Sequence, residues 1–261
     1  MIIDTHAHYD HRQYNGDRDS LIRSLPQNDV NFVINVGSSM NSSRASVRLA
    51  GEYEFFFASV GVHPHEAKSL DEEKLAELKA LCNNKKVVAY GEIGLDFFHN
   101  FSPPDVQHVW FQRQLGLAHE LDLPVIIHSR DAAEDVFDVI KDSSVRKGVI
   151  HSFSGDAALA LRYINLGFYI GIGGVVTFNK AGTLKAAVEA VPLERIVLET
   201  DCPYLTPVPN RGKRNDSLHL TYIANEIAKI KGVSFETICA KTTENALNLF
   251  NLEAKNVILR H

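Results

Sequence analysis

The chain contains 261 residues, of which 45% are hydrophobic and 23% are charged, and this is the composition of an ordinary soluble globular protein. Its formal net charge of -5 excludes the class of proteins that coat nucleic acid with a strongly basic surface. A nucleic-acid substrate is still compatible with this charge, because bound metal cations can supply local positive charge.

Eight short apolar segments alternate with longer segments of helical periodicity. The predicted strands occupy residues 2–6, 32–36, 55–62, 87–93, 124–128, 148–151, 168–172 and 195–201. The predicted helices occupy residues 19–27, 41–52, 71–83, 105–121, 132–141, 156–166, 183–191, 218–231 and 234–250. Nearly continuous apolar strands that alternate with helices indicate an α/β protein whose parallel sheet is buried on both faces.

Eight such units favour a (β/α)8 TIM barrel with extra C-terminal helices, and the length suits this fold of about 250 residues. An open doubly wound sheet is the alternative. No linker or low-complexity segment divides the sequence, so we expect one domain over residues 1–261. We also expect a cytoplasmic protein with free thiols. No signal peptide precedes the first strand, no apolar run approaches the length of a membrane span, and the three cysteines form no CxxC motif.

The first predicted strand carries His6 and His8, which are alternate residues and therefore share one face. Two imidazoles one pleat apart at a strand end can bind one metal ion. Asp4 lies one pleat further back, where we expect it to orient a ligand. A surface histidine pair is the alternative interpretation of this short pattern.

Other polar residues follow apolar strands in the same way, and barrel active sites lie at the carboxyl ends of the strands. The candidate residues are His6, His8, His63, His65, Glu92, His128, His151 and Asp201. Each alone is compatible with a hydrogen-bonded core or rim residue. Together they would carry a large desolvation penalty without a cation, so we predict a metal site.

Four histidines and two carboxylates exceed the three protein ligands of a typical single catalytic metal. We therefore predict two divalent ions, with Glu92 as the bridge between them. The expected ligands are His6, His8, Glu92 and Asp201 for one ion and Glu92, His128 and His151 for the other. We assign Glu92 and Asp201 as the catalytic residues, with Asp201 accepting the proton of the attacking water.

The motifs around these residues resemble those of the TatD family of metal-dependent deoxyribonucleases. The matching segments are Asp4-Thr-His-Ala-His8, Gly61-Val-His-Pro-His65, Gly91-Glu-Ile-Gly-Leu-Asp96, Leu123-Pro-Val-Ile-Ile-His-Ser-Arg-Asp-Ala132, His151-Ser-Phe-Ser-Gly155, Glu199-Thr-Asp-Cys-Pro-Tyr-Leu-Thr-Pro207, Arg211-Gly-Lys-Arg-Asn215 and Asn245-Ala-Leu-Asn-Leu-Phe250. The resemblance covers nearly the whole chain. It implies a TIM barrel, divalent metals and phosphodiester hydrolysis, and the family's ligand positions coincide with the six ligands above. Ser152, Cys202 and Asp216-Ser217 depart from the common pattern without touching a ligand.

Five residues are candidate contacts to a DNA substrate: His63, His65, Arg130, Tyr204 and Arg211. The guanidinium of Arg130 suits a phosphate, and a salt bridge with Asp131 is the alternative. Arg211 begins a basic loop that either touches the DNA backbone or pins the loop through ion pairs. Tyr204 can stack on a base, as can Phe98, and packing is the alternative for both.

The resulting prediction is a monomeric 3′-5′ exodeoxyribonuclease that prefers single-stranded DNA and needs neither a membrane nor an obligate protein partner. Imidazole ligands favour Zn or Mn, whereas the resemblance implies Mg, so the two ions are expected to be Mg, Mn or Zn. The alternatives are an aminoacyl-tRNA ester, lactone or amide hydrolase on the same barrel and a metal-binding scaffold without turnover. Glu92 counts against the lactonase and amidase alternatives, since such enzymes commonly use a carboxylated lysine as the bridge.

Overall fold

The structure, a computed structural model, describes residues 1–252, so the last nine residues of the predicted 1–261 domain lie outside the described residues. Eight strands form one sheet in the order β1 to β8, and every neighbouring pair is parallel. The strands are β1 Ile2–Ala7, β2 Val30–Val36, β3 Phe56–Val60, β4 Val87–Asp96, β5 Val125–Arg130, β6 Gly148–Ile150, β7 Tyr169–Ile172 and β8 Ile196–Leu198. Most of their residues are buried, as a sheet covered on both faces requires.

The first and last strands meet and close the sheet into a barrel. The Thr5 hydroxyl donates a hydrogen bond to the Leu198 carbonyl at 2.9 Å. Backbone hydrogen bonds of 2.9 Å then join Asp201 N to His6 O and His8 N to Cys202 O. The predicted TIM barrel is therefore confirmed, and the open-sheet alternative is wrong.

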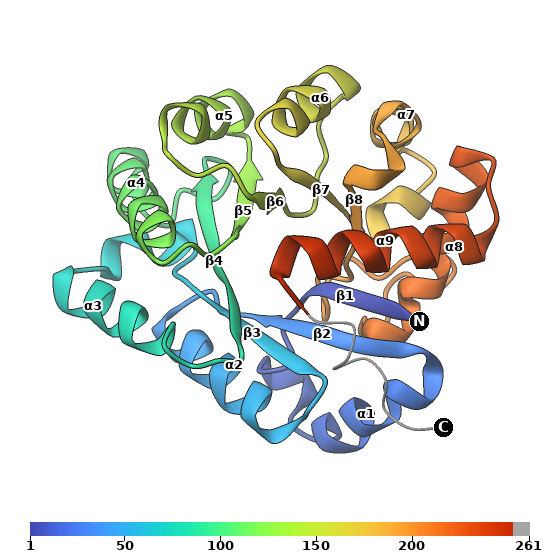
Figure 1. Ribbon diagram of the computed structural model, residues 1–261, viewed down its shortest axis with the longest axis horizontal. Coiled ribbons are helices and arrows are strands. Elements are labelled where there is room, and N and C mark those ends of the chain that lie inside the picture. The colour runs from blue at the N-terminus through green and yellow to red at the C-terminus, as the bar shows by residue number, and fades with distance from the viewer. Residues whose placement is uncertain (253–261) are drawn as a thin grey trace.

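Helices follow the strands and surround the barrel (Figure 1). They are α1 Arg18–Ser24, α2 Met40–Glu52, α3 Glu72–Leu81, α4 Pro104–Glu120, α5 Ala133–Asp142, α6 Ala157–Asn165, α7 Gly182–Ala190, α8 Leu220–Lys231 and α9 Phe235–Phe250. Helix α9 is one of the predicted extra C-terminal helices and lies beside β1 and β8 (Figure 1). Its Asn245 amide donates hydrogen bonds to the carbonyls of Leu193 and Ile196 at 2.8 and 2.7 Å, which fix the start of β8. Within residues 1–252, none of the helices is both long and apolar enough to cross a membrane.

Most predicted element ends lie within two residues of those in the structure, and three ends differ by three residues, each for a local reason. The helix predicted at 19–27 ends at Ser24, because Pro26 cannot continue it. Strand β4 runs three residues past its predicted end and stays paired with β5 there. Gly94, at φ +149°, allows this close pairing, because a Cβ atom at this position would collide with the His128 carbonyl. Strand β8 ends three residues early, and Asp201 then adopts a left-handed φ of 54° that no strand contains.

Candidate metal centre

The structure brings the six predicted ligands together at the carboxyl ends of the strands. Glu92 on β4 lies at the centre of the group and is 4% exposed. Its carboxylate oxygens lie 3.5 Å from His6 Nε2, 2.9 Å from His128 Nδ1 and 3.9 Å from both His8 Nε2 and His151 Nε2. A carboxylate that faces four imidazoles from three other strands is in the position that a bridging ligand requires.

Asp201 closes the group on the side of β1. Its carboxylate lies 3.4 Å from His8 Nε2 and 3.9 Å from both His6 Nε2 and His151 Nε2. The side chain of Asp201 is 16% exposed, against 5% for Glu92, so Asp201 is the carboxylate that solvent reaches more easily.

Three of the histidines have an acceptor beside their outer nitrogen, through a hydrogen bond at His8 and His128 and at ion-pair distance at His151. The Nδ1 atom of His8 lies 3.0 Å from the Val36 carbonyl, which can only accept a hydrogen bond. The Nδ1 atom of His151 lies 3.0 Å from the Glu199 carboxylate, and the Nε2 atom of His128 lies 3.2 Å from that of Asp96. In each neutral ring the proton therefore belongs on the outer nitrogen, which leaves the inner nitrogen with a free lone pair.

These inner lone pairs face one another or a carboxylate. His6 Nε2 and His8 Nε2 are 3.1 Å apart, and His128 Nδ1 is 2.9 Å from Glu92. Lone pairs at such distances repel unless a proton or a cation lies between them. The donor set of imidazole nitrogens and carboxylate oxygens therefore fits a divalent metal ion of the Zn, Mn or Mg group.

The electrostatics of the group favour positive charge at the same place. Burial alone would lower the pKa values of His8 and His151, but nearby carboxylates raise both. Asp201 raises the pKa of His8 to about 9. Glu199 and Asp201 raise the pKa of His151 to about 10. Burial opposes the charged form of Glu92, yet the surrounding imidazoles hold the pKa of that carboxyl well below its usual range. Burial and the charge of His151, which stacks on His6 with ring centroids 3.4 Å apart, lower the pKa of His6.

His63 is close to the group but is oriented differently. Its Nδ1 atom accepts a hydrogen bond from the His65 backbone N–H at 3.1 Å, so the neutral ring carries its proton on Nε2. That Nε2 atom lies 3.6 Å from Glu92. In this tautomer His63 presents an N–H donor to the centre rather than a lone pair.

His65 and Arg130 lie further out on the same side. The Nε2 atom of His65 is 2.7 Å from the Asp96 carboxylate, and its side chain is 27% exposed. Arg130 is exposed and places its guanidinium 4.2 Å above the ring of Phe98, which differs from the alternative of a salt bridge with Asp131. Its outer face remains open to an anion.

Tyr204 and Arg211 lie on the loop that follows β8. Tyr204 is 47% exposed, and its ring stands edge-on to that of His8 at 6.4 Å. Arg211 is exposed and packs its guanidinium on Phe178 at 3.9 Å. In the same basic loop, Arg214 pairs with Asp17 at 2.6 Å, so this arginine pins the loop as the ion-pair alternative predicted.

Asp4 bonds to the backbone of a candidate ligand, since its carboxylate accepts a hydrogen bond from the His6 backbone N–H at 3.3 Å. Its carboxylate accepts hydrogen bonds from the Thr200 backbone N–H at 3.0 Å, the Thr200 hydroxyl at 2.6 Å and the Ser217 hydroxyl at 2.6 Å. Burial raises the pKa of Asp4 to about 6. The residue also ties β1 to the segment that carries Asp201.

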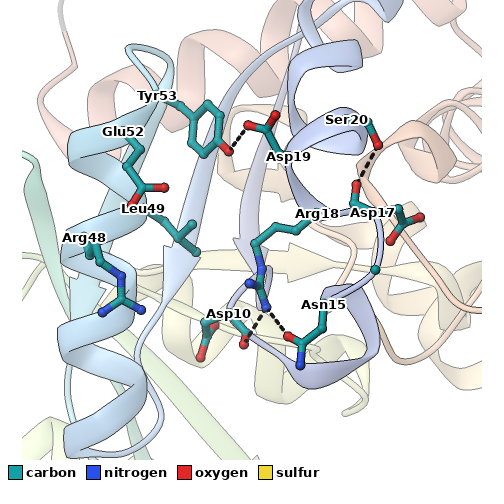
Figure 2. Close-up of a pocket in the computed structure, with 11 residues that line it drawn as sticks. Asp10, Asn15, Asp17, Arg18, Asp19, Ser20, Arg48, Leu49, Glu52 and Tyr53 are labelled. Carbon is teal, nitrogen blue, oxygen red and sulfur yellow. Dashed lines mark hydrogen bonds between the residues drawn. The ribbon is translucent and has the colours of Figure 1, made fainter.

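A hollow of about 570 Å³ lies away from these imidazoles, between the β1–α1 loop and the helices α1 and α2 (Figure 2). Acidic and basic side chains both line it. Arg18 donates to the Asp10 carbonyl at 3.2 Å and to the Asn15 side chain at 2.8 Å (Figure 2). It also donates to the Tyr9 carbonyl at 2.6 Å. None of the candidate ligands lines the hollow, so we interpret it as a solvent-filled groove whose Arg18 supports the loop after His8.

The sequence interpretation assigned no role to Asp96 or Glu199. Both are buried, and each holds the outer nitrogen of a candidate ligand on another strand. A signal was present, because Asp96 and Glu199 also end apolar strands, four residues after Glu92 and two before Asp201 respectively. Their partners His128 and His151 lie on other strands, so the sequence does not show which ring each carboxylate orients.

Comparison with known proteins places this geometry in a family. The profile of the TatD related DNase family matches residues 3–251. YabD from Bacillus subtilis, named an uncharacterised metal-dependent hydrolase, is 41% identical over 97% of this chain and 100% of its own length. The 3′-5′ ssDNA/RNA exonuclease TatD from Cronobacter sakazakii is 37% identical over 91% of this chain and 93% of its own. The crystal structure of the TatD homologue YjjV from Escherichia coli K12 superposes with a TM-score of 0.92 at 30% identity and covers 97% of this chain and 98% of that one.

Proposed function

The chain belongs to the TatD related DNase family of metal-dependent hydrolases, and from this premise we propose that it hydrolyses phosphodiester bonds of DNA. We propose further that it removes nucleotides from the 3′ end and prefers single strands. The name of the Cronobacter sakazakii relative, a 3′-5′ ssDNA/RNA exonuclease, supports this polarity. The observation that carries the proposal is that three histidines are anchored by their outer nitrogens, so that their inner nitrogens converge on Glu92 and Asp201.

Two divalent ions, Mg, Mn or Zn, would be held by the converging groups. The proposed ligands are His6, His8, Glu92 and Asp201 for one ion and Glu92, His128 and His151 for the other. Donor atoms of His6, His8 and Glu92 lie within 4.8 Å of one another, as do those of Glu92, His128 and His63. Such ions supply Lewis acidity, which makes water a nucleophile at neutral pH and neutralises charge on the phosphate. All six ligands come from one chain, so the proposed active unit is a monomer that needs no protein partner.

Asp201 is the proposed general base. Its pKa is lowered because, against burial, the imidazoles of His8 and His151 stabilise the carboxylate, so the group is ionised at neutral pH. Its backbone N–H is bonded to the His6 carbonyl, and this bond fixes the position of the side chain. An ionised carboxylate on the solvent side of the centre can take a proton from water.

The N–H donors around the centre are the proposed phosphate contacts. His63 Nε2–H faces the centre, and the exposed guanidinium of Arg130 has the planar fork that suits phosphate oxygens. His65, Tyr204 and Arg211 lie at the rim and would contact the rest of the substrate. Removal of any one of them should raise KM more than it lowers kcat.

A substrate panel tests the proposal. Purified protein is assayed with single-stranded DNA, duplex DNA, RNA, a phosphotriester and an aminoacyl-tRNA, each with divalent metal and with chelator. We expect 3′-end degradation of single-stranded DNA that the chelator abolishes. Turnover confined to the phosphotriester or the aminoacyl ester would overturn the proposal in favour of another hydrolase on this barrel.

Two variants test the residues. Glu92→Ala and Asp201→Ala should abolish turnover while circular dichroism shows an intact fold. Lys141→Ala, on the outer helix α5, is the control and should leave turnover unchanged. Activity of Asp201→Ala equal to that of the wild type would refute the assignment of Asp201 as base.

A further inference from the structure

The β4–α4 loop, residues 97–103, presents two large apolar side chains to solvent at the mouth of the barrel. Phe98 and Phe101 are each 57% exposed, the largest values among the exposed large hydrophobic residues that the structure describes. Burial of a phenylalanine side chain is normally favourable, so two exposed rings within four residues forgo a substantial stabilisation.

The loop is held firmly, so the exposure is a fixed property of the surface. The Oδ1 atom of Asp96 accepts hydrogen bonds from the backbone N–H groups of Phe98 and His99 at 3.1 and 2.9 Å. The Gln107 amide donates to the Ser102 carbonyl at 2.7 Å. Side chains that are held in place lose little entropy when a ligand binds to them.

Cationic and aromatic groups surround the two rings. The Arg130 guanidinium lies 4.2 Å from the centroid of Phe98. His99 stacks on Phe101 at 5.3 Å with 25° between the rings, and His65 stands edge-on to Phe101 at 4.8 Å. This surface, which we call the loop platform and define as Phe98, Phe101 and Arg130, combines π faces with one positive charge.

The loop platform is joined to the metal centre through Asp96. The Oδ2 atom of Asp96 lies 2.7 Å from His65 Nε2, 3.1 Å from His99 Nδ1 and 3.2 Å from His128 Nε2. One carboxylate therefore contacts both the candidate ligand His128 and the histidines that pack against Phe101. The strand order places β4 across the barrel from β8, so Tyr204 lies on the opposite side of the mouth.

We propose that the loop platform is a nucleobase-binding subsite, on which Phe98 and Phe101 stack bases of single-stranded DNA while the metal centre holds the adjacent phosphate. The assignment rests on the proposed function and adds the part of the substrate that is recognised. Aromatic stacking suits all four bases because each has a π face. With a net charge of -5, the chain has little long-range attraction for phosphate, and stacking would add affinity that does not depend on charge.

Binding measured without turnover tests the proposal. Fluorescence anisotropy with a labelled oligothymidylate, in the presence of chelator, gives Kd for the wild type and for the double variant Phe98→Ala/Phe101→Ala. Loss of one ring should raise Kd about 5- to 150-fold, which corresponds to the roughly 1–3 kcal/mol that stacking contributes for each base. The double variant removes both rings, so its Kd should rise by more than that of either single alanine variant. Because stacking is not ionic, the slope of log Kd against log salt should stay the same in both proteins.

Two controls separate stacking from other effects. Phe98→Tyr/Phe101→Tyr keeps both rings and should bind as the wild type does, and Val109→Ala removes an exposed apolar side chain from α4 without effect. A strand whose sugars carry no bases should bind wild type as weakly as oligothymidylate binds the double alanine variant.

The outcomes for the two proposals can be told apart. Unchanged Kd in the double alanine variant, or equal wild-type affinity for the strand without bases, would overturn the loop platform. A protein that binds through these rings yet hydrolyses no DNA would support the platform and overturn the proposed nuclease function. A protein that hydrolyses DNA with the same KM in both forms would support the nuclease function and overturn the platform.

Discussion

Glu199→Gln is the substitution that tests most directly how the centre is built. Glu199 is 1% exposed, and its Oε1 atom lies 2.5 Å from the Ser152 backbone N and 3.0 Å from His151 Nδ1. The glutamine oxygen can keep both contacts, so His151 retains its tautomer. The negative charge behind the ring is lost, and with it part of the basicity of the proposed ligand nitrogen.

The expected magnitude follows from the role of such carboxylates. Loss of a group that orients a metal-bound histidine weakens metal affinity or activity about 10- to 100-fold, or roughly 1.4–2.7 kcal/mol. The Oε2 atom of Glu199 has no hydrogen-bond partner among the described residues. An amide NH2 in its place would be buried without an acceptor, which should cost a further 1–3 kcal/mol or so of folding stability.

The assay is a titration of the metal-free protein with Mn²⁺ by calorimetry, together with the metal dependence of kcat. Gly171→Ala provides an independent check, because a Cβ at Gly171 would collide with the Glu199 carboxylate and displace it. Glu134→Gln is the control, since Glu134 is exposed and pairs with Arg162 on the outside of the barrel. Wild-type Mn²⁺ affinity in Glu199→Gln would refute the argument that Glu199 acts through His151.

Two further predictions concern stability. In the presence of chelator, the pKa values of His8 and His151 are raised in the folded protein to about 9 and 10. Protonation of these two rings therefore stabilises the fold fully below about pH 6.5, the pKa of a histidine in the unfolded chain. This stabilisation disappears as the pH rises through 9 and 10. The melting temperature should therefore fall more steeply over this pH range in the wild type than in Glu199→Gln, because the variant lacks the carboxylate that raises the pKa of His151. Parallel curves for the two proteins would contradict the role assigned to Glu199. Asp4→Ala should remove the acceptor of the buried Thr200 and Ser217 groups and lower the free energy of unfolding by about 1–3 kcal/mol for each group left unpaired. Denaturant unfolding measures this loss, and Gln112→Ala on the exposed side of α4 should show almost none.

Some features of the molecule could be predicted from the sequence because they depend on local patterns. Apolar runs of strand length between helical segments indicated the barrel, and the alternation in His6-Ala-His8 placed two imidazoles on one face. The rule that barrel sites gather at the carboxyl ends of strands then grouped Glu92, His128, His151 and Asp201 with them. These inferences need only the period of a strand and the parallel order of the sheet.

The orientation of the same groups depended on contacts between strands. Glu199 follows β8 but holds His151 after β6, and Asp4 on β1 accepts hydrogen bonds from Thr200 and Ser217, which lie far along the chain. The sequence contains these carboxylates but does not show their partners. It therefore could not show that Glu199 contacts the ring of His151, or which nitrogen of each histidine carries the proton. A hydrogen bond fixes a tautomer only when donor and acceptor are within about 3 Å, and only the closed barrel brings these residues that close.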